Sequence, residues 1–239
     1  MRARRPEPRC YFWQPRTEGD RPITRRSRAA ADTYHHGNLR QALLEHAVEL
    51  ARVGGPEAVV LRDVQRLAGV SNSAAYRHYA DRDALLAAVT EYAEGRLADA
   101  MVARLNAVPS RGPKAKRALG RLRATGQGYI DFALAEPGLF RTAFAHRETA
   151  DDADPHPADT PAAAVPEHHP FRILSGCIDD LVATGALSAD RRDGLDEAAW
   201  AAVHGLSTLF LDGPLGDADA GRKQLITERL LDAIGDGLR

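Results

Sequence analysis

The sequence predicts an all-α protein, and two observations support this fold class. Apolar residues recur every three or four positions along most of the chain, which is the spacing of one helix face. The breaks between these segments fall at glycine, proline and capping residues, which are typical of helix ends. No segment carries the pattern of a β-strand. With 44% hydrophobic residues over 239 positions, the chain is long enough for one large helical domain or two modest ones.

The N-terminal part is expected to contain an arm and two helices. Residues 1–32 combine Arg and Pro with little apolar periodicity, so we expect a disordered basic arm. A first helix begins at Leu39 and stops at Gly54-Gly55-Pro56. A second, short helix ends at Gly69, and its apolar positions are Leu61, Val64, Leu67 and Ala68.

Capping residues mark the next two helices. Ser71 can cap a third helix that runs to about Tyr79. Asp81 can cap a long fourth helix that breaks at Pro109. We therefore place an N-terminal domain at residues 33–82 and a C-terminal domain at residues 83–239.

The C-terminal part repeats the helical pattern. Amphipathic segments cover residues 119–133 and the stretch after Pro137, and further helices are expected at 171–183, 197–211 and 221–238. Residues 148–169 hold six acidic residues and four prolines, so we expect a mobile acidic loop there.

Charge is distributed unevenly between the two parts. The net charge of −1 is the sum of +6 in residues 1–82 and −7 in residues 83–239. Such a split suggests an N-terminal part that binds a polyanion. No run of 18 apolar residues and no secretory signal is present, so we expect a cytosolic protein without a membrane segment. Cys10 and Cys177 lack the spacing of a disulfide framework or a zinc site.

The turn at Gly69 indicates a helix-turn-helix. Glycine adopts a positive φ without the steric cost of other residues, and Val70 can fill the angle between the two helices. Val64, Ala68 and Ala75 can then pack between the helices. The second helix of such a unit lies in the DNA major groove with its N-terminal residues at base edges. The side chains left facing outward are Asn72, Ser73, Ala74, Arg77 and His78.

At this point the residues resemble a known family. The run “YHHGNLRQALLEHAVELARVGGPEAVVLRDVQRLAGVSNSAAYRHYADRDALLAAV” resembles the DNA-binding domain of the TetR (tetracycline repressor-like) transcriptional regulators, with “AGVS”, “YRHY” and “LLAAV” at the family spacing. The runs “GYIDFALAEPGLFRTAF” and “WAAVHGLSTLF” resemble the ligand-sensing C-terminal domain of a subgroup with a Trp-His-Gly signature. The resemblance implies a DNA-binding domain followed by a helical ligand-binding and dimerisation domain.

The resemblance also implies which residues meet DNA. Arg82 stands where Lys is more usual and keeps the charge for a phosphate. Tyr76 is expected to contact a phosphate. The alternative is that its ring packs at the edge of the domain. Two departures concern stability: Gln65 replaces a usual Ala, and Val60 replaces a Ser or Thr cap of the second helix. The expected DNA-binding residues are Arg62, Ser71, Asn72, Ser73, Ala74, Tyr76, Arg77, His78 and Arg82.

An apolar pocket is expected in the C-terminal domain. Uncharged side chains from three segments would meet there in a helical domain, which suits a small and largely apolar effector. Trp200 and His204 lie one turn apart on one helix face. They can either contact the ligand or pack in the core of a dimer. The expected ligand-binding residues are Tyr129, Phe132, Phe140, Phe144, Phe171, Leu174, Ile178, Trp200 and His204.

Other site chemistries receive less support. His35-His36 and His156, His168 and His169 lack a fixed ligand frame, so no metal or cofactor is expected. Ser175 and His204 form no recognisable nucleophile and base pair, so no enzyme is expected.

The expected function is a homodimeric repressor that binds double-stranded operator DNA and is released by its effector. The alternative is an all-α ligand- or partner-binding protein without operator-specific DNA recognition. The residues expected to build the dimer are Trp200, Leu206, Phe210, Ile226, Leu230 and Ile234.

Overall fold

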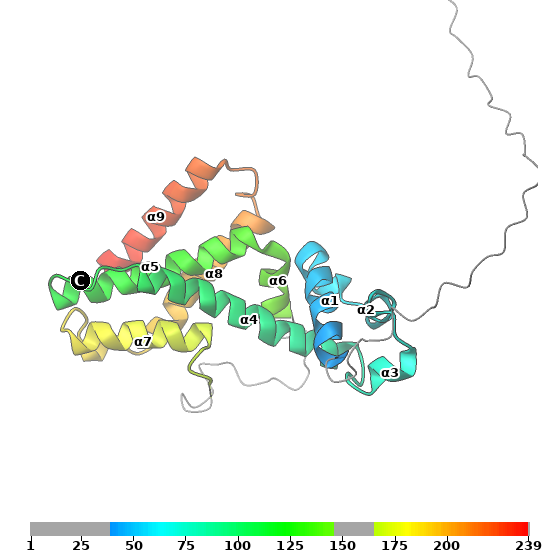
Figure 1. Ribbon diagram of the computed structural model, residues 1–239. Coiled ribbons are helices and arrows are strands. Elements are labelled where there is room, and N and C mark those ends of the chain that lie inside the picture. Colours follow the sequence, from blue (N-terminus) through cyan, green and yellow to red (C-terminus); the bar gives the residue numbers. More distant parts are fainter. Residues whose placement is uncertain (1–38, 146–164, 239) are drawn as a thin grey trace, which may run out of the picture. The chain divides into compact units, whose positions relative to one another are not determined.

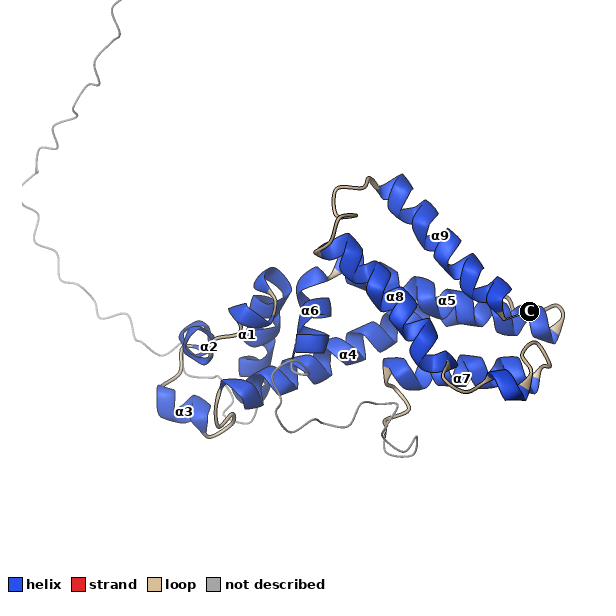
Figure 2. Ribbon diagram, turned by 180° about the vertical axis from the view of Figure 1, so that it is seen from behind, coloured by secondary structure: helices blue, strands red, loops and turns tan. Residues whose placement is uncertain are grey.

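The computed structural model describes residues 39–145 and 165–238, and every regular element within these ranges is a helix (Figures 1 and 2). The predicted all-α class is therefore confirmed. The predicted arm at residues 1–32 lies outside the described residues, as does most of the predicted acidic loop at 148–169.

The first helices pack into a small bundle. They are α1 (Leu39–Gly54), the short 3-10 helix η1 (Pro56–Ala58), α2 (Leu61–Ala68) and α3 (Asn72–Tyr76). Leu43 of α1, Val64 of α2 and Ala75 of α3 are fully buried in one core cluster. The apolar faces of the three helices therefore meet, as the sequence predicts for a helix-turn-helix domain.

One apolar residue of α2 does not belong to its buried face. Leu61, Val64 and Gln65 are buried, whereas the side chain of Leu67 is 47% exposed. Positions i, i+3 and i+4 share one side of a helix, and position i+6 lies away from that side. The predicted second helix is observed, but Leu67 lies outside its buried face and Gln65 is buried there.

The third helix is shorter than predicted. It ends at Tyr76 and not near Tyr79, because Arg77 and His78 form a turn. The N–H groups of His78 and Tyr79 both donate to the carbonyl oxygen of Ala75, at 2.9 Å and 3.1 Å. This turn brings Tyr79 into the core, where only 2% of it is exposed.

The remaining helices form the larger part of the structure. They are α4 (Arg82–Asn106), α5 (Lys114–Ala135), α6 (Pro137–Ala145), α7 (Pro170–Ala183), the 3-10 helix η2 (Ala189–Arg191), α8 (Leu195–Leu211) and α9 (Ala220–Gly237). The predicted caps of α3 and α4 are confirmed. The Ser71 hydroxyl accepts the N–H of Ala74 at 3.3 Å, and the Asp81 carboxylate accepts the N–H of Ala84 at 2.7 Å.

One core cluster runs from the first bundle into the larger part. It includes Val89 and Leu97 of α4, Ile130 of α5 and Leu139 of α6 together with the buried residues of α1 to α3. Helix α4 contacts α1 of the first bundle and also α5, α6 and α7 of the larger part. Helix α6 packs against both α1 and α4 (Figure 1). Interior packing of this kind transmits small displacements, so α4 and α6 connect the two parts mechanically.

Candidate DNA-binding face and buried cavity

The turn between α2 and α3 has the backbone that the sequence predicts. Gly69 ends α2 with φ 66°, in the left-handed region that favours glycine. Its N–H donates to the carbonyl oxygen of Arg66 at 3.3 Å, and the N–H of Val70 donates to that of Gln65 at 3.2 Å. Val70 packs against the core cluster. The turn therefore fixes the angle at which α3 leaves the bundle.

Helix α3 presents polar side chains to the outside. Asn72, Ser73 and Arg77 are exposed, and 49% of Tyr76 is exposed. Ala74 and His78 are half-buried. Amide and guanidinium groups can bond to base edges and phosphates, so this face suits nucleic-acid contact.

Internal contacts engage three residues on or near this face, namely Ser71, Ser73 and Arg40. The exposed Ser71 uses its hydroxyl as the cap of α3 and lies 3.2 Å from the Ser73 hydroxyl. Arg62 is exposed on α2. Arg40 of α1, which the sequence reasoning missed, donates to the carbonyl oxygen of His78 at 3.4 Å and lies over the ring of Tyr79. Arg40 adds a cation beside the end of α3.

Arg82 is held by backbone acceptors. Its Nε donates to the carbonyl oxygen of Val59 at 2.9 Å, and Nη2 donates to that of Pro56 at 2.7 Å. The guanidinium therefore ties the start of α4 to η1. Its expected phosphate contact stays a prediction, but the structure gives Arg82 a structural role that the sequence did not indicate.

A cavity of about 200 Å³ lies among α4 to α9. Side chains from all six helices line it, and most of them are apolar. Of the residues expected at a ligand, the cavity brings together Tyr129, Phe144, Phe171, Leu174 and Trp200. The sequence reasoning missed six polar or charged residues of the lining: Glu94, Arg123, Thr125, His169, Asp232 and Asp236.

The other expected ligand residues do not line the cavity. Phe132 is buried in the main core cluster, and Ile178 is buried in a second cluster formed with Leu181 and Leu187. Phe140 is also buried, and its ring stacks on that of His204 at a centroid distance of 5.5 Å. Apolar periodicity identifies buried positions, but it does not distinguish a core position from a cavity wall.

Tyr129 links the cavity to this aromatic cluster. The indole N–H of Trp200 donates to the Tyr129 hydroxyl at 3.2 Å, because an indole nitrogen can only donate. The Tyr129 hydroxyl also forms a hydrogen bond with Nδ1 of His204 at 2.8 Å. The ring of His204 also lies 4.7 Å from that of Phe144. Trp200 and His204 therefore face the interior of their own chain.

Charged side chains lie at the edges of the cavity. Glu94 Oε2 lies 3.8 Å from His169 Nε2, and these side chains are only 20% and 15% exposed. His169 Nδ1 accepts the N–H of Phe171 at 3.2 Å and so caps α7. Arg123 pairs with Asp232 of α9.

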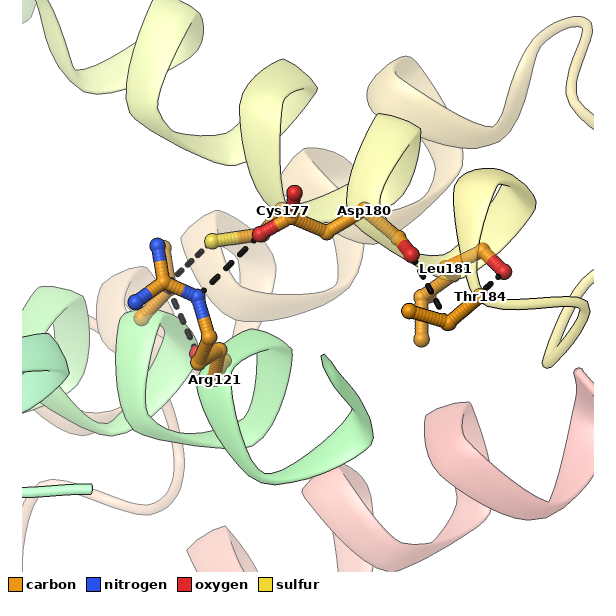
Figure 3. Close-up of polar contacts among 6 residues, drawn as sticks. Arg121, Cys177, Asp180, Leu181 and Thr184 are labelled. Atoms are coloured by element: carbon orange, nitrogen blue, oxygen red, sulfur yellow. Dashed lines mark hydrogen bonds and ion pairs between the residues drawn. The ribbon is translucent and has the colours of Figure 1, made fainter. Parts of the chain in front are cut away.

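Cys177 of α7 is buried in the protein interior, and Figure 3 shows its polar surroundings. Its sulfur lies 3.3 Å from the hydroxyl of Thr125, beside the ion pair of Arg121 with Asp180. Burial raises the pKa of the Cys177 thiol, which disfavours the reactive thiolate. Ser175 donates to the Asp196 carboxylate at 3.1 Å, so its hydroxyl is engaged in the fold.

Metal-binding groups and membrane spans are absent from the part of the chain that the structure describes. No three His, Cys, Asp or Glu side chains are placed there to hold a metal ion. His168 instead contacts Asp99 at 3.0 Å, while His35, His36 and His156 lie outside the described residues. No helix between residues 39 and 145 or between 165 and 238 has both the length and the apolar character of a membrane span.

Two family profiles match the chain. Residues 43–89 match the bacterial regulatory proteins of the tetR family, and residues 122–234 match the tetracyclin repressor-like C-terminal domain. No curated protein matches the chain.

Solved structures share the fold. A protein of unknown function from Rhodococcus sp. RHA1 is similar over 87% of this chain and 98% of its own, with 27% identity and a TM-score of 0.68. A protein from Shewanella sp. PV-4 assigned to the tetR family of transcription regulators is similar over 81% of this chain and 96% of its own, with 20% identity and a TM-score of 0.53.

The fold, the two family profiles and the exposed α3 define the class of protein, which is a helical DNA-binding transcription regulator. The chain belongs to the TetR family. The resemblance to the Trp-His-Gly subgroup stays a prediction.

Proposed function

We propose that the protein is a homodimeric repressor that binds a two-fold symmetric operator through α3 and is released by a small effector in the cavity. The observation that carries this proposal is a chain of contacts. Phe144 of α6 lines the cavity, and the same helix packs directly against α1 of the DNA-binding bundle. A ligand in the cavity therefore adjoins an element that supports α3.

The DNA face supports the first part of the proposal. Asn72 is exposed at the first turn of α3, the end that enters the major groove in this motif. An amide there can read adenine through two hydrogen bonds. Exposed Arg62 and Arg77 suit phosphates, which position the protein without reading sequence. We assign Asn72 to a base edge and both arginines to the backbone.

The contact between α6 and α1 supports release by the effector. A Cβ on Gly138 would lie 2.2 Å from the carbonyl oxygen of Ala51 and 2.3 Å from that of Arg52. Arg52 Nε donates to the carboxylate of Glu136 at 2.9 Å across the same contact. Thr90 of α4 donates to the carbonyl oxygen of Thr142 in α6 at 3.0 Å. A ligand that moves α6 would also move α1 and α4, and it would disfavour operator binding if it prefers that shifted state.

The dimer interface is proposed on the outer faces of α8 and α9. Leu206 and Phe210 are buried in the chain's own core, and Trp200 lines the cavity. Ile226, Leu230 and Ile234 are half-buried against that core. The apolar stripes from which the sequence predicted a dimer are thus largely used within one chain.

A different face of α8 is available to a partner. Ala198, Ala201, Gly205 and Leu209 follow one another at helical spacing, and Leu209 is 41% exposed. No atom lies within 4 Å of a Cβ added at Gly205, so this face is open. Leu225 of α9 is 42% exposed. Small residues allow close approach of a second helix, which supports a dimer contact at this face.

A titration on DNA tests the proposed function against the alternative of a ligand-binding protein without operator recognition. The probe is the DNA upstream of the protein's own gene, measured by footprinting at several salt concentrations. A protected site with a steep salt dependence supports the repressor. Weak binding that is uniform along the DNA supports the alternative.

A further inference from the structure

A second cavity, of about 410 Å³, lies at the end of α4 that is far from the DNA-binding bundle. Its wall is formed by the C-terminal end of α4, the turn that follows, the first part of α5 and the last part of α7. The 25 residues of α4 separate this cavity from the start of the helix by about 36 Å. The second cavity shares no lining residue with the cavity proposed for the effector, so it is a separate site.

The chain segment that forms much of this wall is strongly basic. Residues 100–130 hold seven Lys or Arg and no Asp or Glu, although residues 83–239 together have a net charge of −7. Three of the seven cations line the second cavity, namely Lys114, Arg117 and Arg121. Positive charge gathered in a hollow of a negatively charged domain favours a negatively charged ligand there.

Two of the three cations are not paired with an acid. Asp180 is the one acid among the described lining residues, and it forms an ion pair with Arg121 at 3.2 Å (Figure 3). Within the part of the chain that the structure describes, neither Lys114 nor Arg117 belongs to an ion pair. The two residues lie three positions apart on α5, so they share one face of that helix. The second cavity therefore has an excess of positive charge at this face.

Arg117 also has hydrogen-bonding capacity that its own chain leaves unused. Its Nη1 donates to the carbonyl oxygen of Ser110, which fastens the turn after α4. Its Nε is buried and has no hydrogen-bond partner among the described residues. A buried donor without a partner is unfavourable, and a guanidinium can bind a carboxylate or a phosphate through two parallel N–H bonds. An anion in the second cavity would therefore supply an acceptor that Arg117 lacks.

Apolar side chains complete the wall, among them Leu105, Val108 and Pro109. We propose that the second cavity binds a small organic anion, in which a carboxylate or a phosphate is attached to an apolar group. The acid group would lie at Lys114 and Arg117, and the apolar group would pack against the apolar wall. This site goes beyond the proposed function, because neither operator binding nor release by an effector requires it.

The test measures direct binding to the full chain without DNA. Isothermal titration calorimetry at one ionic strength compares benzoate and phenyl phosphate with the uncharged benzamide and with inorganic phosphate. Each titration is repeated in Lys114→Gln, in Arg117→Gln and in the control Lys116→Gln. Lys116 is an exposed cation in the same turn of α5, and it does not line the second cavity. Circular dichroism checks that each variant is folded.

We expect benzoate or phenyl phosphate to bind at least about tenfold more tightly than benzamide, because only an anion gains charge-assisted hydrogen bonds. The tighter of the two identifies the acid group. Arg117→Gln should weaken this anion at least about tenfold, and Lys114→Gln about threefold because that lysine is exposed. Lys116→Gln should change the affinity by less than about twofold. Inorganic phosphate should bind at least about threefold more weakly than phenyl phosphate, because it buries no apolar group.

Three results would overturn the inference: no saturable binding of either organic anion, benzamide binding as tightly as both, or equal losses in Lys116→Gln and Lys114→Gln. Inorganic phosphate binding as tightly as phenyl phosphate would overturn the role of the apolar wall. If Arg117→Gln fails to fold, the comparison of Lys114→Gln with Lys116→Gln decides alone, since both side chains are exposed.

Discussion

Gly138 of α6 lies against the backbone of Ala51 in α1 so closely that a Cβ at position 138 would be 2.2 Å from the Ala51 carbonyl oxygen. The carbonyl oxygen belongs to the backbone of α1, and an added Cβ would be fixed to the backbone of α6. Rotating a side chain therefore cannot move either atom aside. Any side chain at position 138 must therefore push α6 away from the DNA-binding bundle. This contact joins the cavity wall to the bundle that presents α3.

The close approach predicts the effect of Gly138→Ala. Separating α6 from α1 should lower the free energy of unfolding by about 1–3 kcal/mol, measured by urea denaturation. The control is Gly176→Ala on α7, where no atom lies within 4 Å of the added Cβ. That change should be neutral or stabilise the protein by up to about 1 kcal/mol. An unchanged stability of Gly138→Ala would show that the two helices separate without cost.

Arg82 is expected to stabilise the folded protein. Arg82→Ala leaves two carbonyl oxygens, those of Val59 and Pro56, without this donor, so the free energy of unfolding should fall by about 1–3 kcal/mol. Arg62→Ala removes an exposed cation and should change stability by no more than about 0.5 kcal/mol. Both are measured without DNA. If Arg82→Ala unfolds like wild type but weakens binding to all DNA, its role is the phosphate contact that the sequence predicts.

The ion pair of Arg141 with Asp212 predicts a pH dependence. Arg141 Nε lies 3.1 Å from both oxygens of the carboxylate, and this bonding lowers the pKa of Asp212. A folded-state pKa below the unfolded one stabilises the protein at neutral pH. That stabilisation is lost as the pH falls through the ordinary carboxyl pKa to the lowered one.

Asp212→Asn should therefore destabilise the protein at pH 7, by no more than about 1 kcal/mol because both side chains are partly exposed. The difference from wild type should shrink as acid is added. Thermal unfolding at several pH values measures it, with Asp217→Asn as the exposed control. A difference that stays constant down to acidic pH would contradict the role of this pair.

The proposed dimer face predicts the effect of a charge at Leu209. Leu209→Glu should give monomers in sedimentation velocity and should lose operator affinity, because a two-fold operator needs both heads. Val53→Glu is the matched control, since Val53 is 90% exposed on α1, outside the proposed interface. A Leu209→Glu protein that still sediments as a dimer would place the interface elsewhere.

Local chemistry determined which features could be predicted from the sequence. Glycine at 69 and the caps at Ser71 and Asp81 act within a few residues, so their roles are visible in the sequence and are confirmed. The all-α class follows from periodicity in the same way. The predicted length of α3 was wrong because contacts with α1 hold Tyr79 in the core. One of these contacts is the hydrogen bond that the Tyr79 hydroxyl donates to the Arg40 carbonyl oxygen.

The cavity was only partly predictable because its wall depends on packing between distant segments. Phe132 and Phe144 lie on amphipathic helices with similar patterns, yet one fills the core and the other lines the cavity. Glu94 and His169 meet across 75 residues of sequence, and nothing in their local patterns indicates this. The role of Arg82 was missed for the same reason, since its acceptors, the carbonyl oxygens of Val59 and Pro56, lie 23 and 26 residues away in the sequence.

The role of Asn72 tests the account most directly, because a regulator must distinguish its operator from other DNA. The measurement compares the affinity of wild type and Asn72→Ala for the footprinted operator and for random DNA at one salt concentration. Asn72→Ala should cost about 1–3 kcal/mol on the operator and nothing on random DNA. Arg77→Ala, the control for a phosphate contact, should weaken both and reduce the salt slope by about one unit. Equal losses of Asn72→Ala on the operator and on random DNA would contradict base reading by α3.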